Sequence, residues 1–150
     1  MLDSINIRRA RLDDVDALTR IRRTAILTLA AKKIGESQAQ AWVDSAAPNR
    51  IQYAIEAHLV WIATLADQTV GWVEVNDNQI KGIYVQPAQA RHGIGSALLT
   101  YAEEHIRTAG YVTVTFDASW NAEKFYRHRG YQPRGKRSPE EGLPMVKTFA

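Results

Sequence analysis

The sequence predicts a mixed α/β fold built on one mixed sheet, and three observations support this. The chain has 150 residues, the size of one domain with a substantial core. Stretches with the two-residue apolar period of strands alternate with stretches that have the helical period. No internal repeat, low-complexity tract or linker interrupts them. We therefore expect residues 1–150 to form a single domain with the order β-α-α-βββ-α-β-α-ββ.

The first third of the chain is predicted to be a strand followed by helices. Residues 5–10 alternate apolar and polar side chains, as an opening strand does. In residues 12–30 the apolar side chains recur at spacings of three and four, which predicts an amphipathic helix with Asp13 or Asp14 as its N-cap. Two weaker helical patterns follow, at residues 39–46 and 49–57.

The rest of the chain is predicted to contain three strands in succession and then a strand-helix alternation. The polar connectors "ADQ" and "NDNQ" between the three strands indicate hairpin turns. The next helix ends at Gly110 and a later, shorter one ends at Gly130, as helices often do at glycine. The predicted strands are 59–65, 69–75, 80–85, 111–119, 131–135 and 143–149, and the helices are 94–109 and 121–129.

Residues 83–99 read "IYVQPAQARHGIGSALL", a strand, a polar loop and a helix that opens through two glycines. Gly93 and Gly95 allow another molecule to come close to the backbone, and the free N–H groups of a helix N-terminus favour an anion. The loop therefore predicts a phosphate-bearing ligand. A purely structural role for these glycines is the alternative.

A dinucleotide is one ligand that fits such a loop. Its fingerprint requires a third glycine or an alanine, and Leu98 stands at that position. Asp117 does lie at a strand end about 20 residues further on, where a ribose-binding acid belongs. Dinucleotide binding therefore stays open as an alternative at this point.

Two motifs together favour another ligand. Val85 and Pro87, followed by "RHGIGSALL" at 91–99, resemble the pyrophosphate loop of the GNAT superfamily of N-acetyltransferases. The segment "NAEKFYRHRGY" at 121–131 resembles the helix that follows the fifth strand in that superfamily. One position departs from the family pattern, because Ala90 stands where the loop usually begins with glutamine or arginine.

The resemblance implies acetyl-CoA as co-substrate, held by the loop and the strand before it. Main-chain N–H groups near Val85 are expected to meet the acetyl carbonyl, while the pantetheine arm pairs with the strand. Asn121 either contacts the pantetheine or only caps its helix. The expected cofactor-binding residues are Tyr84, Val85, Ala90, Arg91, His92, Gly93, Ile94, Gly95, Ser96 and Asn121.

The resemblance also implies catalytic roles. Tyr126 matches the tyrosine expected to protonate the leaving thiolate, although it could instead be an aromatic packed beside Phe125. Glu74, in the strand before the cofactor strand, is the expected base that deprotonates the amine through water. The alternatives are that Glu74 faces solvent or that His58 is the base.

The sequence does not identify the acceptor, but the resemblance implies where the acceptor binds. In the family its cleft is built largely by the segment between the first two strands, here residues 12–57, in which Trp42 and Tyr53 are candidates for its lining. An amine-bearing small molecule or a peptide fits equally. The alternative to an enzyme is a non-catalytic module that senses acyl-CoA.

Composition narrows the remaining classes. The chain has no cysteine, which excludes disulfides, thiolate metal sites and a cysteine nucleophile, and no metal is expected. Without a signal peptide or an apolar run of about 18 residues, a soluble cytoplasmic protein is expected and a membrane partner is not. The net charge of +3 suits a phosphate-bearing ligand without implying a nucleic-acid surface. Homodimers are common in the family, and nothing in this sequence decides the point.

A basic cluster follows the second motif. Most of its side chains are expected to be solvated, with one or two meeting either the 3′-phosphate of the cofactor or an acidic substrate. Its members are Arg127, Arg129, Arg134, Lys136 and Arg137.

Overall fold

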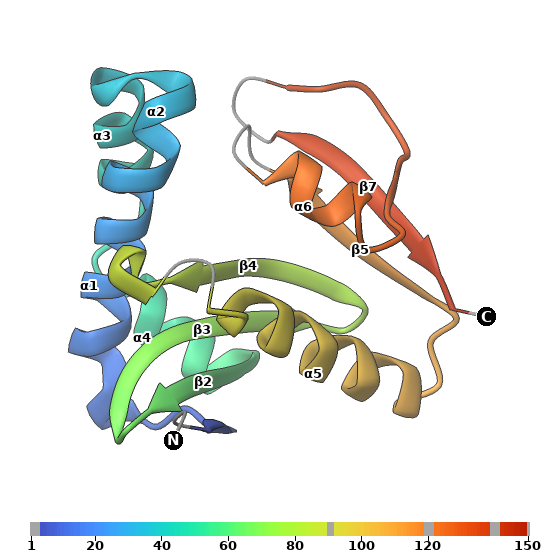
Figure 1. Cartoon of the computed structure of the whole chain (residues 1–150), viewed down its shortest axis with the longest axis horizontal. Coiled ribbons are helices and arrows are strands. Elements are labelled where there is room, and N and C mark those ends of the chain that lie inside the picture. Colours follow the sequence, from blue (N-terminus) through green and yellow to red (C-terminus); the bar gives the residue numbers. More distant parts are fainter. Residues whose placement is uncertain (1–3, 90–91, 119–121, 139–141, 150) are drawn as a thin grey trace.

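Seven strands form one mixed sheet in the computed structural model, which describes residues 4–89, 92–118, 122–138 and 142–149. Their order across the sheet is β1-β2-β3-β4-β5-β7-β6. Figure 1 shows β2, β3 and β4 side by side, with β5 and β7 beyond them. This confirms the predicted mixed α/β fold. The strands are β1 (Ile5–Arg9), β2 (Leu59–Leu65), β3 (Gln68–Asn76), β4 (Gln79–Val85), β5 (Thr113–Ala118), β6 (Gln132–Pro133) and β7 (Leu143–Thr148).

The helices lie mainly between β1 and β2 and after β4. The helix predicted over residues 12–30 continues without a break to Ile34, through a π-helical segment in its middle. The helical elements are η1 (Leu12–Asp14), α1 (Val15–Ala25), η2 (Ile26–Ala30), α2 (Ala31–Ile34), α3 (Glu36–Asp44), α4 (Arg50–Ala57), η3 (Pro87–Gln89), α5 (Ile94–Thr108) and α6 (Glu123–Arg127).

Tight turns join β2 to β3 and β3 to β4, as the polar connectors predicted. Ala66 and Asp67 both have positive φ, 50° and 63°, and Asp77 has a φ of 55°. Successive positive φ values match the right-handed twist of a hairpin. The second turn sets the pairing of Val75 on β3 with Ile80 on β4, and a shift in the register directly after this pair places Glu74 opposite Gly82.

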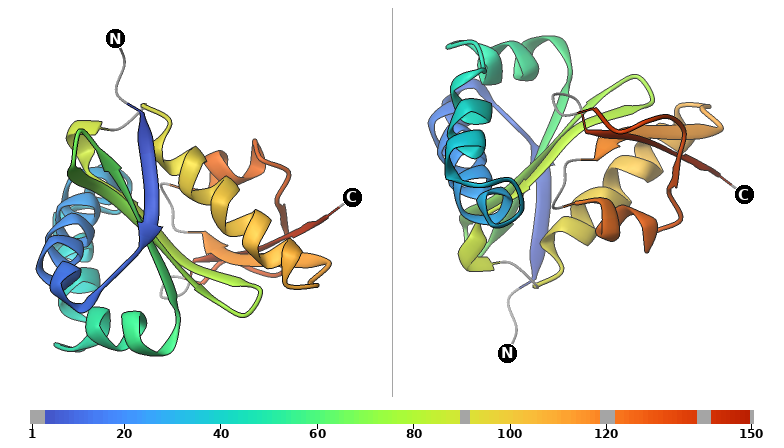
Figure 2. Two further views of the ribbon diagram at one scale, coloured as in Figure 1. Left: turned by 90° about the horizontal axis from the view of Figure 1, so that it is seen from below. Right: turned by 90° about the horizontal axis from the view of Figure 1, so that it is seen from above.

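Helices cover both faces of the sheet at β3. On one face, Leu18 and Ile21 of α1 pack with Trp72 of β3, whose indole N–H donates to the Leu18 carbonyl at 3.1 Å. On the other face, α5 packs against Val73 and Val75. Figure 2 shows α1 to α4 on one side of β1–β4 and α5 on the other. We call these the α1 face and the α5 face.

Strands β4 and β5 separate soon after they meet. Their parallel ladder holds only two residue pairs, Gln79 with Thr115 and Ile80 with Phe116, among the described residues. Beyond it the two strands diverge, and β5 pairs along its length with β7 instead (Figure 1). Residues 81–85 of β4 therefore have no ladder partner in β5, and the sheet opens into a wedge.

Antiparallel pairing dominates this sheet. Of the strand pairs in the described residues, only β4–β5 is parallel. The dinucleotide fingerprint belongs to an open, mostly parallel sheet with helices wound on both faces. The observed sheet is not of that type, and so the fold does not support the dinucleotide-binding alternative.

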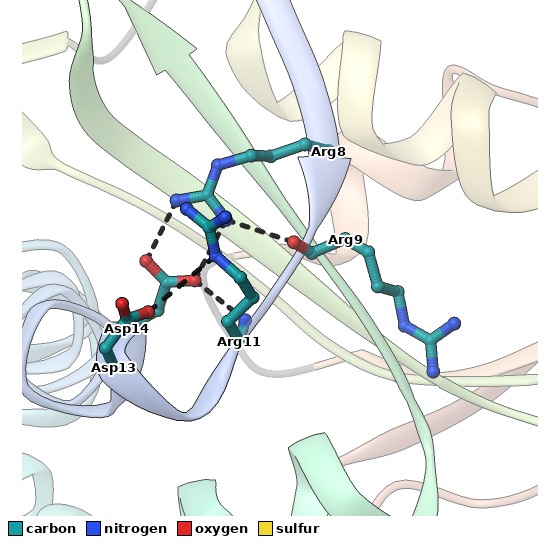
Figure 3. A network of polar contacts seen from close by, with 5 residues as sticks. All are labelled: Arg8, Arg9, Arg11, Asp13 and Asp14. Atoms are coloured by element: carbon teal, nitrogen blue, oxygen red, sulfur yellow. Dashed lines mark hydrogen bonds and ion pairs between the residues drawn. The ribbon is translucent and has the colours of Figure 1, made fainter.

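An ion pair fixes the corner between β1 and α1 (Figure 3). Arg8 donates from both terminal nitrogens to the two oxygens of Asp14, each at 2.9 Å. The same carboxylate accepts a hydrogen bond from the main-chain N–H of Arg11 at 2.8 Å. Arg11 is therefore the N-cap of the short η1. Asp14, one of the two predicted positions, is the N-cap residue of α1, although its side chain makes no capping hydrogen bond to that helix.

Candidate active site

A cavity of about 240 Å³ occupies the wedge between β4 and β5. Its walls include every residue of β4 from position 81 to the end of the strand, the part without a partner in β5. The lining residues are Ala25, Ile26, Ala30, Trp42, Lys81, Gly82, Ile83, Tyr84, Val85, Gly95, Phe116, Asp117, Ala122, Phe125 and Tyr126.

Both faces of the sheet contribute to this cavity. Tyr84 packs with the core of the α1 face, whereas Ile83 and Val85 pack with the core of the α5 face. Residues of α1, η2 and α3 line one end, and residues of α5 and α6 line the other. Two molecules that enter from opposite faces can therefore meet within the wedge.

Tyr126 lies in the wall of the cavity and is 2% exposed. Its ring stacks on Phe116 with 4.1 Å between centroids and meets the rings of Phe125 and Tyr131 edge-on. Burial raises the pKa of its phenol well above the ordinary value. Tyr126 is thus both a packed aromatic and a cavity residue, and it keeps its proton at neutral pH.

The two loop glycines have different roles. Gly93 precedes α5 with a φ of 80°, a left-handed conformation that favours glycine. Gly95 instead lines the cavity, where an added Cβ would lie 3.6 Å from Phe125 and 3.7 Å from Val85. The first glycine shapes the turn, and the second leaves space beside the wedge.

The N-terminus of α5 presents free donors. Among the described residues, no group accepts a hydrogen bond from the main-chain N–H of Gly95 or Ser96. An anion next to the first turn of a helix is stabilised by such groups. His92 is exposed, and its own main-chain N–H donates to the Gln89 carbonyl at 3.3 Å.

The other predicted cofactor residues divide into three groups. Tyr84 and Val85 line the cavity. Ile94 is buried in the core, so only its main chain is available to a ligand, while the Ser96 hydroxyl accepts a hydrogen bond from Arg129. Those that lie outside the described residues are Ala90, Arg91 and Asn121.

Glu74 is buried, with 3% of its surface exposed, and so the expectation of a solvent-facing residue is wrong. Its position two residues after Trp72 places it on the α1 face. His58 Nδ1 lies 2.7 Å from one carboxylate oxygen, and Arg50 donates to the other at 3.2 Å. Glu74 does not itself line the cavity, although its ladder partner Gly82 does.

This Glu74–His58–Arg50 cluster was only partly predictable. The sequence offers Glu74 and His58 as alternative bases. It does not predict that these two residues contact each other, or that Arg50 joins them. One signal was available: Glu74 is the one charged residue in the apolar run at 69–75, and a run of that kind is consistent with a strand buried on both faces.

More side chains of the basic cluster make ion pairs or hydrogen bonds than expected. Arg127 and Arg137 both pair with Glu123. Arg129 lies over the ring of Phe125 at 3.8 Å and bonds its carbonyl as well as Ser96. Arg129 thereby connects α6 to the first turn of α5, next to the cavity. Arg134 and Lys136 are exposed, as predicted.

Of the two aromatic residues predicted to line the acceptor cleft, one lines the cavity and the other does not. Trp42 lines the cavity from α3. Tyr53 is exposed and meets the ring of His58 edge-on, with 5.5 Å between centroids. Sequence reasoning missed the contribution of Ala25, Ile26 and Ala30, because only the fold brings this helical segment over β4.

Solved structures have this architecture in common with the chain. A GCN5-related N-acetyltransferase from Rhodopseudomonas palustris superposes with a TM-score of 0.90 at 25% identity, over 99% of this chain and 98% of the other. The PaiA N-acetyltransferase from Thermoplasma acidophilum, in complex with coenzyme A, gives 0.81 at 18% identity, over 97% and 99%. The described residues thus have the acyl-CoA N-acyltransferase fold.

Sequence comparison assigns the family. The model of the acetyltransferase (GNAT) domain matches residues 30–148. The uncharacterized N-acetyltransferase YafP of Escherichia coli (strain K12) is 29% identical over 133 residues, which cover 87% of this chain and 83% of that protein. The chain belongs to the GNAT acetyltransferase family, as the two motifs predicted. Within the described residues, no helix has the length and apolarity needed to cross a membrane.

Proposed function

We propose that residues 1–150 act as one catalytic domain that transfers an acetyl group from acetyl-CoA directly to a primary amine. The cavity in the β4–β5 wedge is the observation that carries this proposal, since it is lined from both faces of the sheet. Acetyl-CoA is assigned to the α5 face, where the free N–H groups of α5 suit its pyrophosphate. The coenzyme A complex of the PaiA enzyme supports the choice of cofactor.

The amine is assigned to the α1 face, where the Glu74–His58–Arg50 cluster lies. Glu74 takes the proton of the acceptor ammonium group, through a water molecule or through His58. The cluster suits this role because His58 and Arg50 hold both carboxylate oxygens in place. The freed nitrogen lone pair then attacks the acetyl carbonyl.

Two further steps complete the transfer. Main-chain N–H groups at the unpaired end of β4, near Val85, stabilise the oxyanion that forms. As this tetrahedral oxyanion collapses and the carbon–sulfur bond breaks, Tyr126 gives its proton to the departing thiolate. The nitrogen releases its second proton to solvent, and Tyr126 takes a proton back from solvent. Its raised pKa keeps this proton available at physiological pH.

Calorimetric titration with acetyl-CoA tests the proposal, with NADH as the control ligand and an amine screen for thiol release afterwards. We expect acetyl-CoA to bind and Tyr126→Phe to leave that affinity unchanged, because the ring still packs on Phe116. Turnover of the variant should fall by about 10²- to 10⁴-fold, as for the loss of a general acid.

The other outcomes separate the alternatives. Full turnover in Tyr126→Phe would remove this residue from the chemistry. Acetyl-CoA binding without turnover of any amine would favour a non-catalytic acyl-CoA sensor. Absence of acetyl-CoA binding would contradict the proposal altogether.

A further inference from the structure

Arg22 of α1 is a buried cation that has no carboxylate partner in the part of the chain that the structure describes. Its residue surface is 8% exposed, and its Nε is buried with no hydrogen-bond acceptor. No carboxylate of the described residues lies within 4 Å of its guanidinium. Its guanidinium carbon lies over the ring of Tyr84, 5.8 Å from the ring centroid.

The arginines around it behave differently. Arg8 and Arg50 pair with Asp14 and Glu74, and Arg20 and Arg23 on the same helix are exposed to water. A charge removed from water without a partner is costly, and a cation–π contact offsets only part of that cost. An unpaired guanidinium at this depth is therefore best explained by a ligand that supplies the missing anion.

The position of Arg22 indicates which ligand that is. Ala25 and Ile26, one turn further along the same helix, line the cavity, and so does Tyr84. Ala25, Ile26 and Tyr84 reach the cavity from the α1 face, the side that the proposed function assigns to the amine. Arg22 lies next to this wall, over the ring of Tyr84, and does not itself line the cavity. The pyrophosphate donors Gly95 and Ser96 belong to α5, on the other side of the sheet.

We propose that Arg22 binds an anionic oxygen group, a carboxylate or a phosphate, on the acceptor amine. The inference rests on the proposed function and narrows its acceptor to amines that carry a negative charge. The guanidinium presents its donors in a planar fork that matches both kinds of anion. A bound anion would also neutralise the buried positive charge of Arg22.

Matched amines test this assignment. Initial rates of thiol release are measured at saturating acetyl-CoA for three pairs: glycine and glycinamide, 5-aminopentanoate and pentylamine, and phosphoethanolamine and ethanolamine. The first two pairs report on a carboxylate and the third on a phosphate. Thermal stabilisation of the protein by each amine, with coenzyme A present, gives a second readout that does not require turnover.

Two variants identify the residue responsible. Arg22→Met removes the charge but keeps the length, and Arg23→Met is the matched control on the exposed side of the helix. Since the Arg22 charge has no partner, Arg22→Met should melt at or above the wild-type temperature. Reduced activity in this variant would then not be due to unfolding.

The wild type should prefer the anionic member of at least one pair by roughly 10- to 100-fold, the range of a charge-assisted hydrogen bond. Arg22→Met should lose that preference, keep the rates and stabilisation given by neutral amines, and keep its affinity for acetyl-CoA. Arg23→Met should behave as the wild type. Equal rates and equal thermal stabilisation with the two members of every pair would overturn the proposal.

Two other results overturn it as well. A preference that survives in Arg22→Met would assign the anion to another residue. A loss of acetyl-CoA affinity in that variant would show that Arg22 serves the cofactor. If the wild type fails to bind acetyl-CoA, the proposed function fails, while stabilisation by anionic but not neutral amines still decides the role of Arg22.

Discussion

Tyr126 and Glu74, the proposed acid and base, differ in how the fold holds them. Tyr126 is held by aromatic packing and lines the cavity, with its pKa raised by burial. Glu74 is held by polar contacts with His58 and Arg50 and stands behind the cavity wall. The buried phenol of Tyr126 keeps its proton until a thiolate requires it, whereas the Glu74 carboxylate has its two oxygens held by side-chain nitrogens of His58 and Arg50.

Glu74→Gln should lower the turnover of an accepted amine by about 10²- to 10⁴-fold near neutral pH. Its deficit should shrink as pH rises, because a growing fraction of the amine is already neutral and requires no base. The deficit of Tyr126→Phe should persist up to about pH 8, since a leaving thiolate still needs a proton below the ordinary thiol pKa of about 8.5. Steady-state rates between about pH 6 and 10 check this contrast, a window bounded by the ordinary titration of amines and phenols.

The matched control is Glu56→Gln, on the exposed side of α4. It removes one carboxylate from the same neighbourhood without touching the cluster. A deficit of Glu74→Gln that stays constant with pH would assign Glu74 to structure and leave the base unidentified.

At the scale of elements, the corner between β1 and α1 depends on the Arg8–Asp14 pair. The hydrogen bonds from Arg8, together with the Arg11 main-chain N–H, lower the pKa of the Asp14 carboxyl below its ordinary value. Because the folded-state pKa is depressed, the stabilisation is complete above the unfolded-state pKa. It is lost as pH falls through the lower, folded-state value.

Asp14→Asn should therefore lower the free energy of unfolding by about 2 kcal/mol at neutral pH, the scale of hydrogen bonds to a charged group. Its difference from the wild type should narrow as pH falls below about 4. Denaturant unfolding at several pH values measures this. Asp13→Asn is the control, because its 3.8 Å pair with Arg11 is exposed and should contribute little. Equal effects of the two substitutions would contradict the assignment.

Element order was largely predictable from the sequence, because apolar periodicity and turn residues are local signals. The strands at 59–65 and 80–85 and the helix that begins at Ile94 were located to within a residue or so. The π-helical segment Ile26–Ala30 was not, since its apolar stripe resembles that of an ordinary helix. The length of β6 was also predicted wrongly, because the pattern predicted a strand over 131–135 and the observed strand is shorter.

The site was predictable in part, for a physical reason. Gly93, Gly95 and Tyr126 belong to contiguous motifs, and a motif preserves local geometry. The contacts of Glu74 with His58 and Arg50, and the unpaired Arg22, depend on how α1 and α4 pack on the sheet. No local pattern encodes such distances between segments.

At the scale of the whole molecule, the account depends on the opening between β4 and β5. Two ladder pairs hold the strands together, and beyond them the sheet gives way to a cavity with walls from both faces. A direct transfer needs such a passage, because donor and acceptor must meet without an acyl-enzyme intermediate. The central claim is that acetyl-CoA occupies this wedge.

The most direct measurement is the affinity for acetyl-CoA, by calorimetry, of the wild type, Gly95→Leu and Thr100→Leu. The Cβ at position 95 fits beside Phe125 and Val85, so the helix tolerates it while the rest of the leucine side chain fills the cavity. Thr100 is exposed on the same helix, and its variant adds similar bulk away from the wedge. The account predicts unchanged binding for Thr100→Leu and a loss of about 100-fold or more, about 2.7 kcal/mol, for Gly95→Leu. Equal affinity in Gly95→Leu and the wild type, or no binding by the wild type, would contradict it.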